Sequence, residues 1–256
     1  MKEKKIGLSV VIIARNEEKK IKECLESVKW ADEIILVDNG SSDKTKDIAE
    51  SFNAEIIDYK NGSYSDLRNE GLRKSRGKWI LYVDADERVD ESLRKEIITE
   101  IRKSKNKYNS FAIPRRNTVL GRVMKHGGWW PDYVKRLFRK DKLKKWKGDL
   151  HEEPQFEGEM GHLKNPLIHI KEDNLTEMMD KTNKWSEIEA ELMYKAGHPK
   201  MNVLRFASAI FREFWLRMIR NLGFLDGPEG IIFSLYQVWS KFISYAKLWE
   251  LQNTKK

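Results

Sequence analysis

Short apolar runs alternate with amphipathic stretches between residues 6 and 101. The runs are rich in β-branched residues and bounded by polar turns, which is the pattern of buried β-strands. The predicted strands are Leu8–Ala14, Ile34–Val37, Glu55–Ile57 and Lys78–Val83. Apolar residues recur at helical spacing around these strands, namely at Ile21, Cys24, Leu25 and Val28 and at Leu93, Ile97 and Ile101, the latter behind a potential N-cap, Asp90. Because strands alternate with helices, we expect an α/β fold whose mostly parallel sheet carries helices on both faces.

The pattern changes after residue 101. Residues 102–110 are polar and predict a loop, and residues 110–170 contain short strand-like runs such as Lys135–Phe138 and Leu167–Ile170. From about residue 175 to the end the spacing is helical. We therefore expect one α/β domain over residues 1–172, with halves at 1–101 and 110–172, and a helical extension over residues 173–256.

The composition is that of a folded protein with a basic surface. The 256 residues are 40% hydrophobic and 35% charged, and the formal net charge is +9. The single cysteine, Cys24, excludes an internal disulfide bond and a zinc site of paired cysteines, and fits a reducing compartment. The apolar run at Leu8 stops at Arg15, so no signal peptide is expected, and the uncharged stretch Gly230–Ser240 is shorter than the about 20 residues of a spanning helix.

The residues that directly follow each predicted strand in the sequence are the candidate functional residues, because ligands of such sheets bind outside the carboxyl ends of the strands. The second strand is followed by Asp38 and a Gly/Ser turn, and the fourth by Asp84-Ala85-Asp86. Residues two apart in an extended segment face the same side, so the carboxylates of Asp84 and Asp86 are expected to point the same way. Such a pair suits Mg²⁺ or Mn²⁺ shared with a diphosphate. The alternatives are an ordinary acidic turn after the fourth strand and a turn after Asp38 that merely caps the next helix.

The motifs of residues 8–101 together resemble those of the family 2 glycosyltransferases, which have the GT-A fold. Four matching segments follow the first predicted strand along the sequence. In order, they are Asp38-Asn39-Gly40-Ser41-Ser42-Asp43, Arg68-Asn69-Glu70-Gly71, Gly77-Lys78-Trp79-Ile80 and Asp84-Ala85-Asp86. The resemblance implies an inverting, metal-dependent transfer of a sugar from a nucleoside-diphosphate donor, with a UDP-sugar favoured, to a carbohydrate or glycolipid acceptor. Residues 1–101 would bind the nucleotide sugar, and residues 110–172 would hold the acceptor and catalytic groups.

The resemblance also implies roles for single residues. The donor-binding residues that it indicates are Ala14, Arg15, Glu17, Asp38, Arg68 and Asp84. Asp38 would contact the base or ribose, Arg68 the diphosphate, and Asp84 the ribose or sugar; the alternative for Arg68 is an exposed position on a helix. Asp86 would bind the Mn²⁺ or Mg²⁺ that bridges the two phosphates and neutralises the charge of the leaving group.

A second group of motifs resembles the branch of this family that contains lipopolysaccharide-core glucosyltransferases. Arg136-Leu137-Phe138 is followed by His151-Glu152 and by a later strand residue, His169. Inversion requires a carboxylate that takes the proton of the attacking acceptor hydroxyl. We predict Glu152 as this base, with Asp149 as its rival. The branch implies a role in lipopolysaccharide or other cell-envelope glycan synthesis.

The remaining candidates each have a structural alternative. His151 is a candidate metal or phosphate ligand, or else a structural hydrogen-bonding residue. His169, on an apolar strand, is expected in the core or beside a ligand residue. Trp129 and Trp130 stand next to Gly127, Gly128 and Pro131, where they would stack on an acceptor sugar or simply pack under the loop.

The helical extension has the composition of a membrane-surface element. On a helical wheel one face collects the apolar residues Val203, Ile210, Phe211, Phe214, Met218 and Leu222, and the other collects Arg205, Arg212, Arg217 and Arg220. A turn over residues 223–230 and a second helix over about 231–250 follow. We expect residues 203–250 to bind an anionic membrane surface; the alternative is a helical hairpin that packs on the catalytic domain or on a second subunit.

These expectations place the protein in the cytoplasm, peripheral at the inner face of the cytoplasmic membrane, with a homo-oligomer as a further option. A nucleotidyltransferase of related sheet topology is disfavoured, because Ala14-Arg15-Asn16-Glu17 stands where its Gly-rich phosphate loop would be. A non-catalytic protein that binds nucleic acid or another anionic surface is the alternative from the net charge alone. It is disfavoured because carboxylates at successive strand ends repel phosphate, so no nucleic-acid partner is expected.

Overall fold

The computed structural model describes residues 7–103, 106–148, 152–172 and 174–254. The chain divides into two compact units. The first consists of Met1–Arg115 and Tyr133–His169, and the second of Arg116–Asp132 and Ile170–Lys256.

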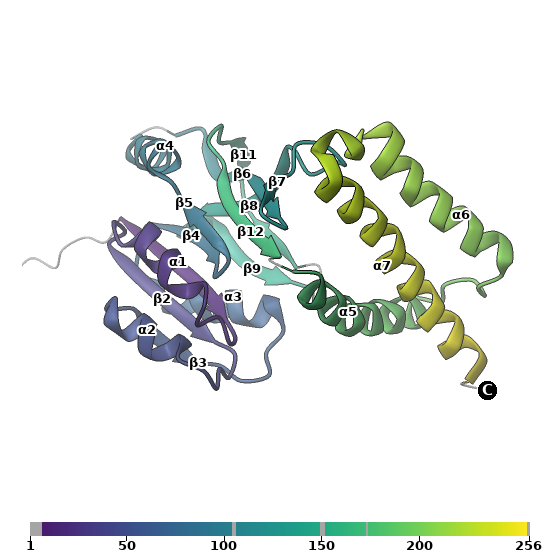
Figure 1. The fold of residues 1–256 in the computed structure, drawn as a ribbon. Helices are drawn as coiled ribbons and strands as arrows, with labels where there is room; N and C mark the ends of the chain where they lie inside the picture. The colour runs from purple at the N-terminus through teal and green to yellow at the C-terminus, as the bar shows by residue number, and fades with distance from the viewer. Residues whose placement is uncertain (1–6, 104–105, 149–151, 173, 255–256) are drawn as a thin grey trace, which may run out of the picture. The chain divides into compact units, whose positions relative to one another are not determined.

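A mixed β-sheet forms the centre of the first unit (Figure 1). The strands follow the order β3-β2-β1-β4-β8-β6-β12-β5. They are β1 (Leu8–Ala14), β2 (Glu33–Asp38), β3 (Glu55–Asp58), β4 (Trp79–Asp84), β5 (Glu87–Val89), β6 (Tyr108–Val119), β8 (Asp132–Arg139) and β12 (Leu167–Glu172). β1 runs parallel to β2 and β4, and β2 runs parallel to β3, so the carboxyl ends of these strands share one edge. β8 pairs antiparallel with β4, and β12 pairs antiparallel with β5.

Helices and short strands complete the first unit. The helices are α1 (Ile21–Val28), α2 (Thr45–Ser51), α3 (Tyr64–Lys74) and α4 (Glu91–Arg102). The short elements are the 3₁₀ turn Lys140–Lys142 and the strands β9 (Leu143–Lys147), β10 (Glu153–Phe156) and β11 (Glu159–His162). β9 and β10 form a separate antiparallel pair, and β11 runs parallel to β6.

Both faces of the sheet are covered, because consecutive β1 residues point to opposite sides. Leu8, Val10, Ile12 and Ala14 join α1 and α4 in one apolar cluster. Val11 and Ile13 join α3 and the β9–β10 pair in another.

The four predicted strands are confirmed to within a residue or two at their ends. The predicted cap is also confirmed, since the Asp90 side chain accepts a hydrogen bond from the Leu93 amide at 2.8 Å.

α3 approaches β1 unusually closely, and one glycine permits this. A Cβ atom on Gly71 would overlap the side chain of Val11. The helix begins with a capping box in which Ser63 and Asp66 exchange hydrogen bonds, so its first turn is also fixed. Asn69 then binds β9 through both its amide atoms, accepting from the Trp146 amide at 2.7 Å and donating to the Trp146 carbonyl at 2.9 Å. These contacts fix the face of α3 that carries Arg68.

The second unit is mainly helical. Its elements are the end of β6 paired with β7 (Arg122–Val123), α5 (Leu175–Lys195), α6 (Val203–Phe214), the π-helical stretch Trp215–Arg220, the 3₁₀ turn Gly223–Asp226 and α7 (Gly227–Thr254). α7 packs against both α5 and α6 (Figure 1). In the described part of the chain, no helix has both the length and the apolar character needed to cross a membrane.

Two details of the second unit differ from the sequence prediction. The predicted turn over residues 223–230 is shorter, because the 3₁₀ turn ends at Asp226 and α7 begins at Gly227. The predicted regular α-helix over residues 203–222 ends at Phe214, and Trp215–Arg220 is wound as a π-helix. A π-turn adds one residue per hydrogen-bonded ring, so side chains beyond Phe214 rotate away from the positions of an ideal helical wheel.

Candidate functional site

The carboxyl end of β2 presents a buried carboxylate. Asp38 is fully buried, and its Oδ1 accepts hydrogen bonds from the amides of Gly40 at 3.0 Å and Ser41 at 2.8 Å. Its Oδ2 is also buried and has no hydrogen-bond partner among the described residues. Buried polar atoms are normally paired, so this oxygen is a ready acceptor for a ligand donor. Gly40, with φ of 83°, provides the turn that brings the two amides back to Asp38.

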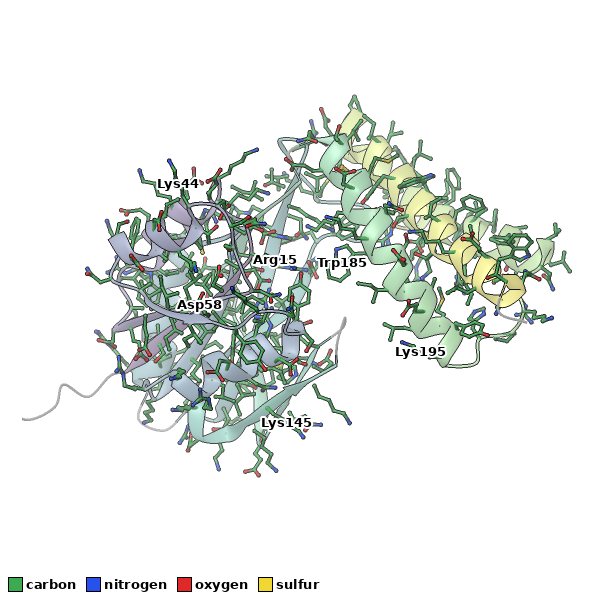
Figure 2. The ribbon with its side chains drawn as sticks, turned by 90° about the horizontal axis from the view of Figure 1, so that it is seen from below. Arg15, Lys44, Asp58, Lys145, Trp185 and Lys195 are labelled. Atoms are coloured by element: carbon green, nitrogen blue, oxygen red, sulfur yellow. The ribbon has the colours of Figure 1, made fainter. Side chains whose placement is uncertain are left out.

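The loops behind β1 and β2 are bound to each other. The Asn16 side chain accepts from the Ser42 amide at 2.8 Å, and the Glu17 amide donates to the Thr45 hydroxyl at 2.8 Å. Ala14 is buried at the end of β1 and its carbonyl accepts from the Asn39 amide. Arg15 is exposed at the surface of the first unit (Figure 2). The two loops that carry these predicted donor residues are therefore linked to each other by hydrogen bonds.

Asp43 links the same two loops and its pKa is perturbed. Its Oδ2 accepts from the Glu18 amide at 3.0 Å, and its Oδ1 accepts from the Thr45 amide at 3.0 Å and from the Thr45 hydroxyl. Desolvation by itself raises the pKa of Asp43, but these hydrogen bonds outweigh it and hold the pKa below the ordinary value of 3.8.

Replacement of Asp43 is expected to cost stability in a pH-dependent way. Asp43→Asn places an amide NH₂ group against the Glu18 or Thr45 donors, so we expect a loss of about 1–2 kcal/mol in the free energy of unfolding at pH 7. A carboxyl whose folded pKa is lowered stabilises the fold above the unfolded value of 3.8 and loses this effect as the pH falls through the folded pKa. The difference between wild type and variant in urea unfolding should shrink below about pH 4.

Asp47→Asn serves as the control for this experiment. Asp47 is an exposed carboxylate on the neighbouring α2, and its loss should change stability by less than about 0.5 kcal/mol at any pH. An Asp43→Asn difference that stays constant down to pH 3 would show that the tie between the loops does not depend on the charge of Asp43.

Arg68 is the centre of the next group of residues. Its side chain is 2% exposed, its Nη2 donates to Asp84 Oδ1 at 3.0 Å, and its Nε donates to Glu152 Oε1 at 3.0 Å. The guanidinium lies over the rings of Tyr82 and Trp146, at 5.5 and 5.0 Å from their centroids. Its Nη1 is buried and lacks a hydrogen-bond partner among the described residues. Arg68 is therefore a buried residue of the site and not an exposed helix residue.

A network of buried charges surrounds Asp84. Arg136 donates to Asp84 and, at 3.0 Å, to Glu87, while Glu87 accepts from the Asp84 amide at 2.9 Å. Arg115 lies 3.7 Å from the fully buried Glu87. Burial alone would raise the pKa of Asp84, but the positive charges of Arg136, Arg68 and Arg115 outweigh it and hold the pKa well below its usual range. Asp84 is thus an ionised group whose two oxygens are both engaged by arginines.

Asp86 points to a different partner. Its Oδ2 lies 3.4 Å from Nε2 of His169, which is 7% exposed on β12. The pairing of β12 with β5 sets this contact, because His169 is opposite Glu87, the residue that follows Asp86. The described residues contain no group of three His, Cys, Asp or Glu side chains arranged as a metal site. Asp86 and His169 nevertheless bring one carboxylate oxygen and one imidazole nitrogen together.

The predicted catalytic residues fall at the edge of the described chain. Glu152 precedes β10 and is bound to Arg68, and its side chain is 17% exposed. Asp149 and His151 lie outside the described residues. The role of Asp149 as an alternative base and that of His151 as a metal or phosphate ligand stay predictions.

The tryptophans predicted for the acceptor belong to the second unit. Trp129 packs on Phe233 with ring centroids 4.8 Å apart, and the cations of Arg217 and Lys171 lie 4.6 and 4.7 Å from its ring. Trp130 is 42% exposed. The faces of Trp129 are therefore occupied within its own unit, whereas Trp130 has free surface for stacking.

Sequence reasoning assigned no role to three residues of the charged group, namely Arg136, which it named only as part of a motif, Glu87 and Arg115. The signal for Arg136 was present, because a cation next to Leu137 and Phe138 in an apolar strand must find a buried partner. Glu87 directly follows the Asp84-Ala85-Asp86 motif, but the sequence does not reveal that the short β5 turns it inward. Arg115 lies on β6, far from the motifs along the chain.

The chain is similar to several known glycosyltransferases. The lipopolysaccharide core biosynthesis glycosyltransferase LpsC of Rhizobium meliloti is 26% identical, over 96% of this chain and 93% of its own length. A protein described as an uncharacterized glycosyltransferase of Rickettsia bellii is 27% identical, over 95% of this chain and 86% of its own. Among solved structures, the mannosyltransferase PcManGT of Pyrobaculum calidifontis superposes with a TM-score of 0.52 at 12% identity, covering 99% of this chain and 88% of that one.

The family model for glycosyl transferase family 2 matches residues 9–156, which is more than half of the chain. The predicted GT-A fold with a C-terminal helical extension is confirmed. The chain therefore belongs to glycosyl transferase family 2, and it is a glycosyltransferase.

Proposed function

We propose that the protein is an inverting, metal-dependent transferase that moves a sugar from a nucleoside-diphosphate donor to a carbohydrate or glycolipid acceptor. The observation that carries this proposal is the bridge made by Arg68, which hydrogen-bonds both Asp84 from the donor motif and Glu152 from the predicted catalytic motif. Arg68 and Glu152 are 84 positions apart in the sequence and yet form a hydrogen bond. Their contact supports a site in which a hydrogen-bond donor for the diphosphate and a catalytic base lie side by side.

The donor side of the site suits a nucleotide. The unpaired Asp38 Oδ2 would accept a hydrogen bond from the base or ribose, and the unpaired Arg68 Nη1 would donate one to a diphosphate oxygen. PcManGT was solved with GDP-Man and Mn²⁺, which supports a nucleotide sugar as the class of donor. Among nucleotide sugars, the UDP-sugar predicted from the sequence is the first to test.

A divalent cation fits beside Asp86. Asp86 and His169 supply an oxygen and a nitrogen donor 3.4 Å apart, and these two residues would hold a divalent cation such as Mn²⁺. Asp84 is a poor ligand, because both its oxygens are engaged by Arg68 and Arg136. The bound cation would neutralise charge on the departing diphosphate. Asp86 and His169 are accordingly the proposed ligands, and His151 stays a prediction.

The reaction itself requires one carboxylate base. In an inverting transfer the acceptor hydroxyl attacks the anomeric carbon from the face opposite the nucleotide, the bond between that carbon and the diphosphate oxygen breaks, and the electron pair leaves with the nucleoside diphosphate. Glu152 would take the hydroxyl proton. Arg68 holds the Glu152 carboxylate in place through Oε1, and Oε2 would be the oxygen that takes the proton. Arg68 thereby couples the position of the base to the donor motif.

The acceptor class follows from the relatives and stays a proposal. LpsC is described as acting in lipopolysaccharide core biosynthesis, so a lipopolysaccharide precursor or another cell-envelope glycan is the acceptor that we favour. The exposed Trp130 would stack on an acceptor sugar. Association of residues 203–250 with the inner face of the cytoplasmic membrane belongs to the same proposal, and so does a homo-oligomer.

The metal-dependent part is tested with Asp86→Ala. We expect Mn²⁺ to strengthen binding of UDP or GDP to the wild-type protein by at least about tenfold, because the cation shares the diphosphate charge with the protein. In Asp86→Ala this gain should disappear while the weak metal-free binding stays. Isothermal titration with and without Mn²⁺ measures both quantities.

Asp141→Ala is the matched control, since Asp141 is an exposed carboxylate paired with Arg139 on the same unit. It should retain the full Mn²⁺ effect. An unchanged Mn²⁺ effect in Asp86→Ala would place the cation elsewhere.

A further inference from the structure

α6 and the π-helical stretch expose an apolar ridge. Leu204 is 79% exposed, Phe211 66%, Trp215 50% and Ile219 43%. We call these four residues the α6 ridge. The rings of Phe211 and Trp215 stack at a centroid distance of 6.3 Å, so the ridge is continuous at its centre. Leu204 and Phe211 are seven residues apart on α6 and lie on one side of this helix, and the stacked ring of Trp215 continues the ridge into the π-helical stretch.

The ridge coincides only in part with the apolar face that the helical wheel predicts. Phe211 belongs to both, and Val203 and Leu222 of the predicted face are also exposed, whereas Ile210, Phe214 and Met218 are partly buried. Phe206 is also partly buried and packs on Phe242 of α7, with ring centroids 5.8 Å apart. The helix is therefore apolar on two sides, one that packs within the unit and one that does not.

Cations lie beside the ridge. Arg205, Arg212 and Arg220 are exposed, and no carboxylate lies within 4.0 Å of their guanidinium groups in the described part of the chain. The other arginine of this segment, Arg217, is held by Glu213 at 2.8 Å and by the Gly127 carbonyl at 3.0 Å. Three arginines are thus available to an external partner, while the one acidic residue of the segment is already paired.

α7 continues the apolar surface. Its exposed residues include Ile231, Leu235, Phe242 and Trp249, at 38%, 47%, 39% and 49%. Phe242 is at once exposed and in contact with Phe206 of α6, so the exposed side chains of α7 reach the seam between the two helices. Trp249 and Trp215 have the amphipathic indole ring that suits a membrane interface.

We infer that the α6 ridge inserts into the interfacial region of an anionic lipid bilayer, with Arg205, Arg212 and Arg220 at the level of the headgroups. An exposed apolar ridge with unpaired cations beside it matches an anionic interface in both shape and charge. A second copy of this chain fits less well, because self-association would bring the unpaired arginines of two ridges together. The inference rests on the membrane association in the proposed function and deepens it by naming the residues that enter the bilayer and those that meet its headgroups.

A single labelled cysteine tests the position of the ridge. Cys24 is fully buried, so an environment-sensitive thiol dye would react selectively with Ser208→Cys, an exposed position beside the ridge on α6. We expect its emission to shift to the blue with vesicles that contain phosphatidylglycerol in phosphatidylcholine. The same dye on Ser51→Cys, exposed on α2 of the first unit, should not shift. Vesicle binding without a shift at position 208 would overturn the inference.

Two sets of variants separate the apolar and ionic parts. Phe211→Ser with Trp215→Ser should weaken vesicle binding by about tenfold or more, whereas Met179→Ser with Ile188→Ser, at similarly exposed positions of α5, should not. Replacement of Arg205, Arg212 and Arg220 by Gln should weaken it by about fivefold per residue, and the same change at Lys22, Lys78 and Lys145 of the first unit should have a smaller effect.

Light scattering without vesicles tests whether a second copy of the chain, and not a bilayer, covers the α6 ridge. A dimer that Phe211→Ser with Trp215→Ser dissociates would assign the ridge to a second copy and overturn the inference. Nucleotide binding is measured in the absence of lipid, so a failure of the proposed transferase activity leaves the vesicle result interpretable, and a failure of vesicle binding leaves the nucleotide result interpretable.

Discussion

Glu152→Gln is expected to lower the rate of sugar transfer by about 10²–10⁴-fold, because an amide cannot take the proton of the acceptor hydroxyl. Gln keeps an oxygen that can accept the Arg68 hydrogen bond, so the position of Arg68 and its contact with Asp84 should persist. Binding of the nucleotide should therefore change little, and the loss should appear in kcat with acceptor present. The measurement is release of nucleoside diphosphate, after a screen of UDP-, GDP- and dTDP-sugars has identified the donor.

The neighbouring residue provides the control. Glu153 is an exposed carboxylate that pairs with Lys135, and Glu153→Gln should retain wild-type transfer. If Glu152→Gln also retains full transfer, the base is another residue, and Asp149 becomes the leading candidate.

Arg136→Met is expected to lower the free energy of unfolding by about 3–5 kcal/mol, the usual result of removing one member of a buried ion pair. The fully buried Glu87 would keep the Asp84 amide and the more distant Arg115 but would lose its closest cation. Asp84 would lose one of its two arginines. Denaturant unfolding followed by circular dichroism measures the change.

A matched position on the same strand shows whether burial is the cause. Arg139 also lies on β8 but pairs with Asp141 at the surface, so Arg139→Met should cost about 1 kcal/mol or less. Glu87→Gln in the Arg136→Met background should recover part of the loss, because it removes the unpaired buried charge. Equal losses for Arg136→Met and Arg139→Met would contradict the role assigned to the buried network.

Local patterns predicted the first half of the fold well. β1 was predicted with its observed limits, since seven consecutive buried residues leave little choice but a central parallel strand. The second half was harder because its strands are short and mixed. β5 has three residues and β7 has two, lengths at which periodicity carries little information.

The site divides in the same way. Motif order brought Arg68, Asp84 and Glu152 onto one list of candidates, and the structure places Arg68 within hydrogen-bonding distance of both Asp84 and Glu152. The network around Glu87 was not predictable, because it depends on the antiparallel pairings of β8 and β12, which no local pattern encodes. The helical wheel did not predict the side-chain positions beyond Phe214, because a wheel assumes a regular α-helix and the chain forms a π-helical stretch there.

The paired amide contacts between Asn69 and Trp146 have a consequence for how this region opens. Arg68 reaches Glu152 just ahead of β10, whereas its neighbour Asn69 fastens the adjoining β9, whose Trp146 ring also lies under the Arg68 guanidinium. The β9–β10 ribbon therefore cannot detach from α3 without dismantling the charge bridge at the same moment. Hydrogen–deuterium exchange at the Trp146 amide would then measure how often the contacts of Arg68 and Asn69 open.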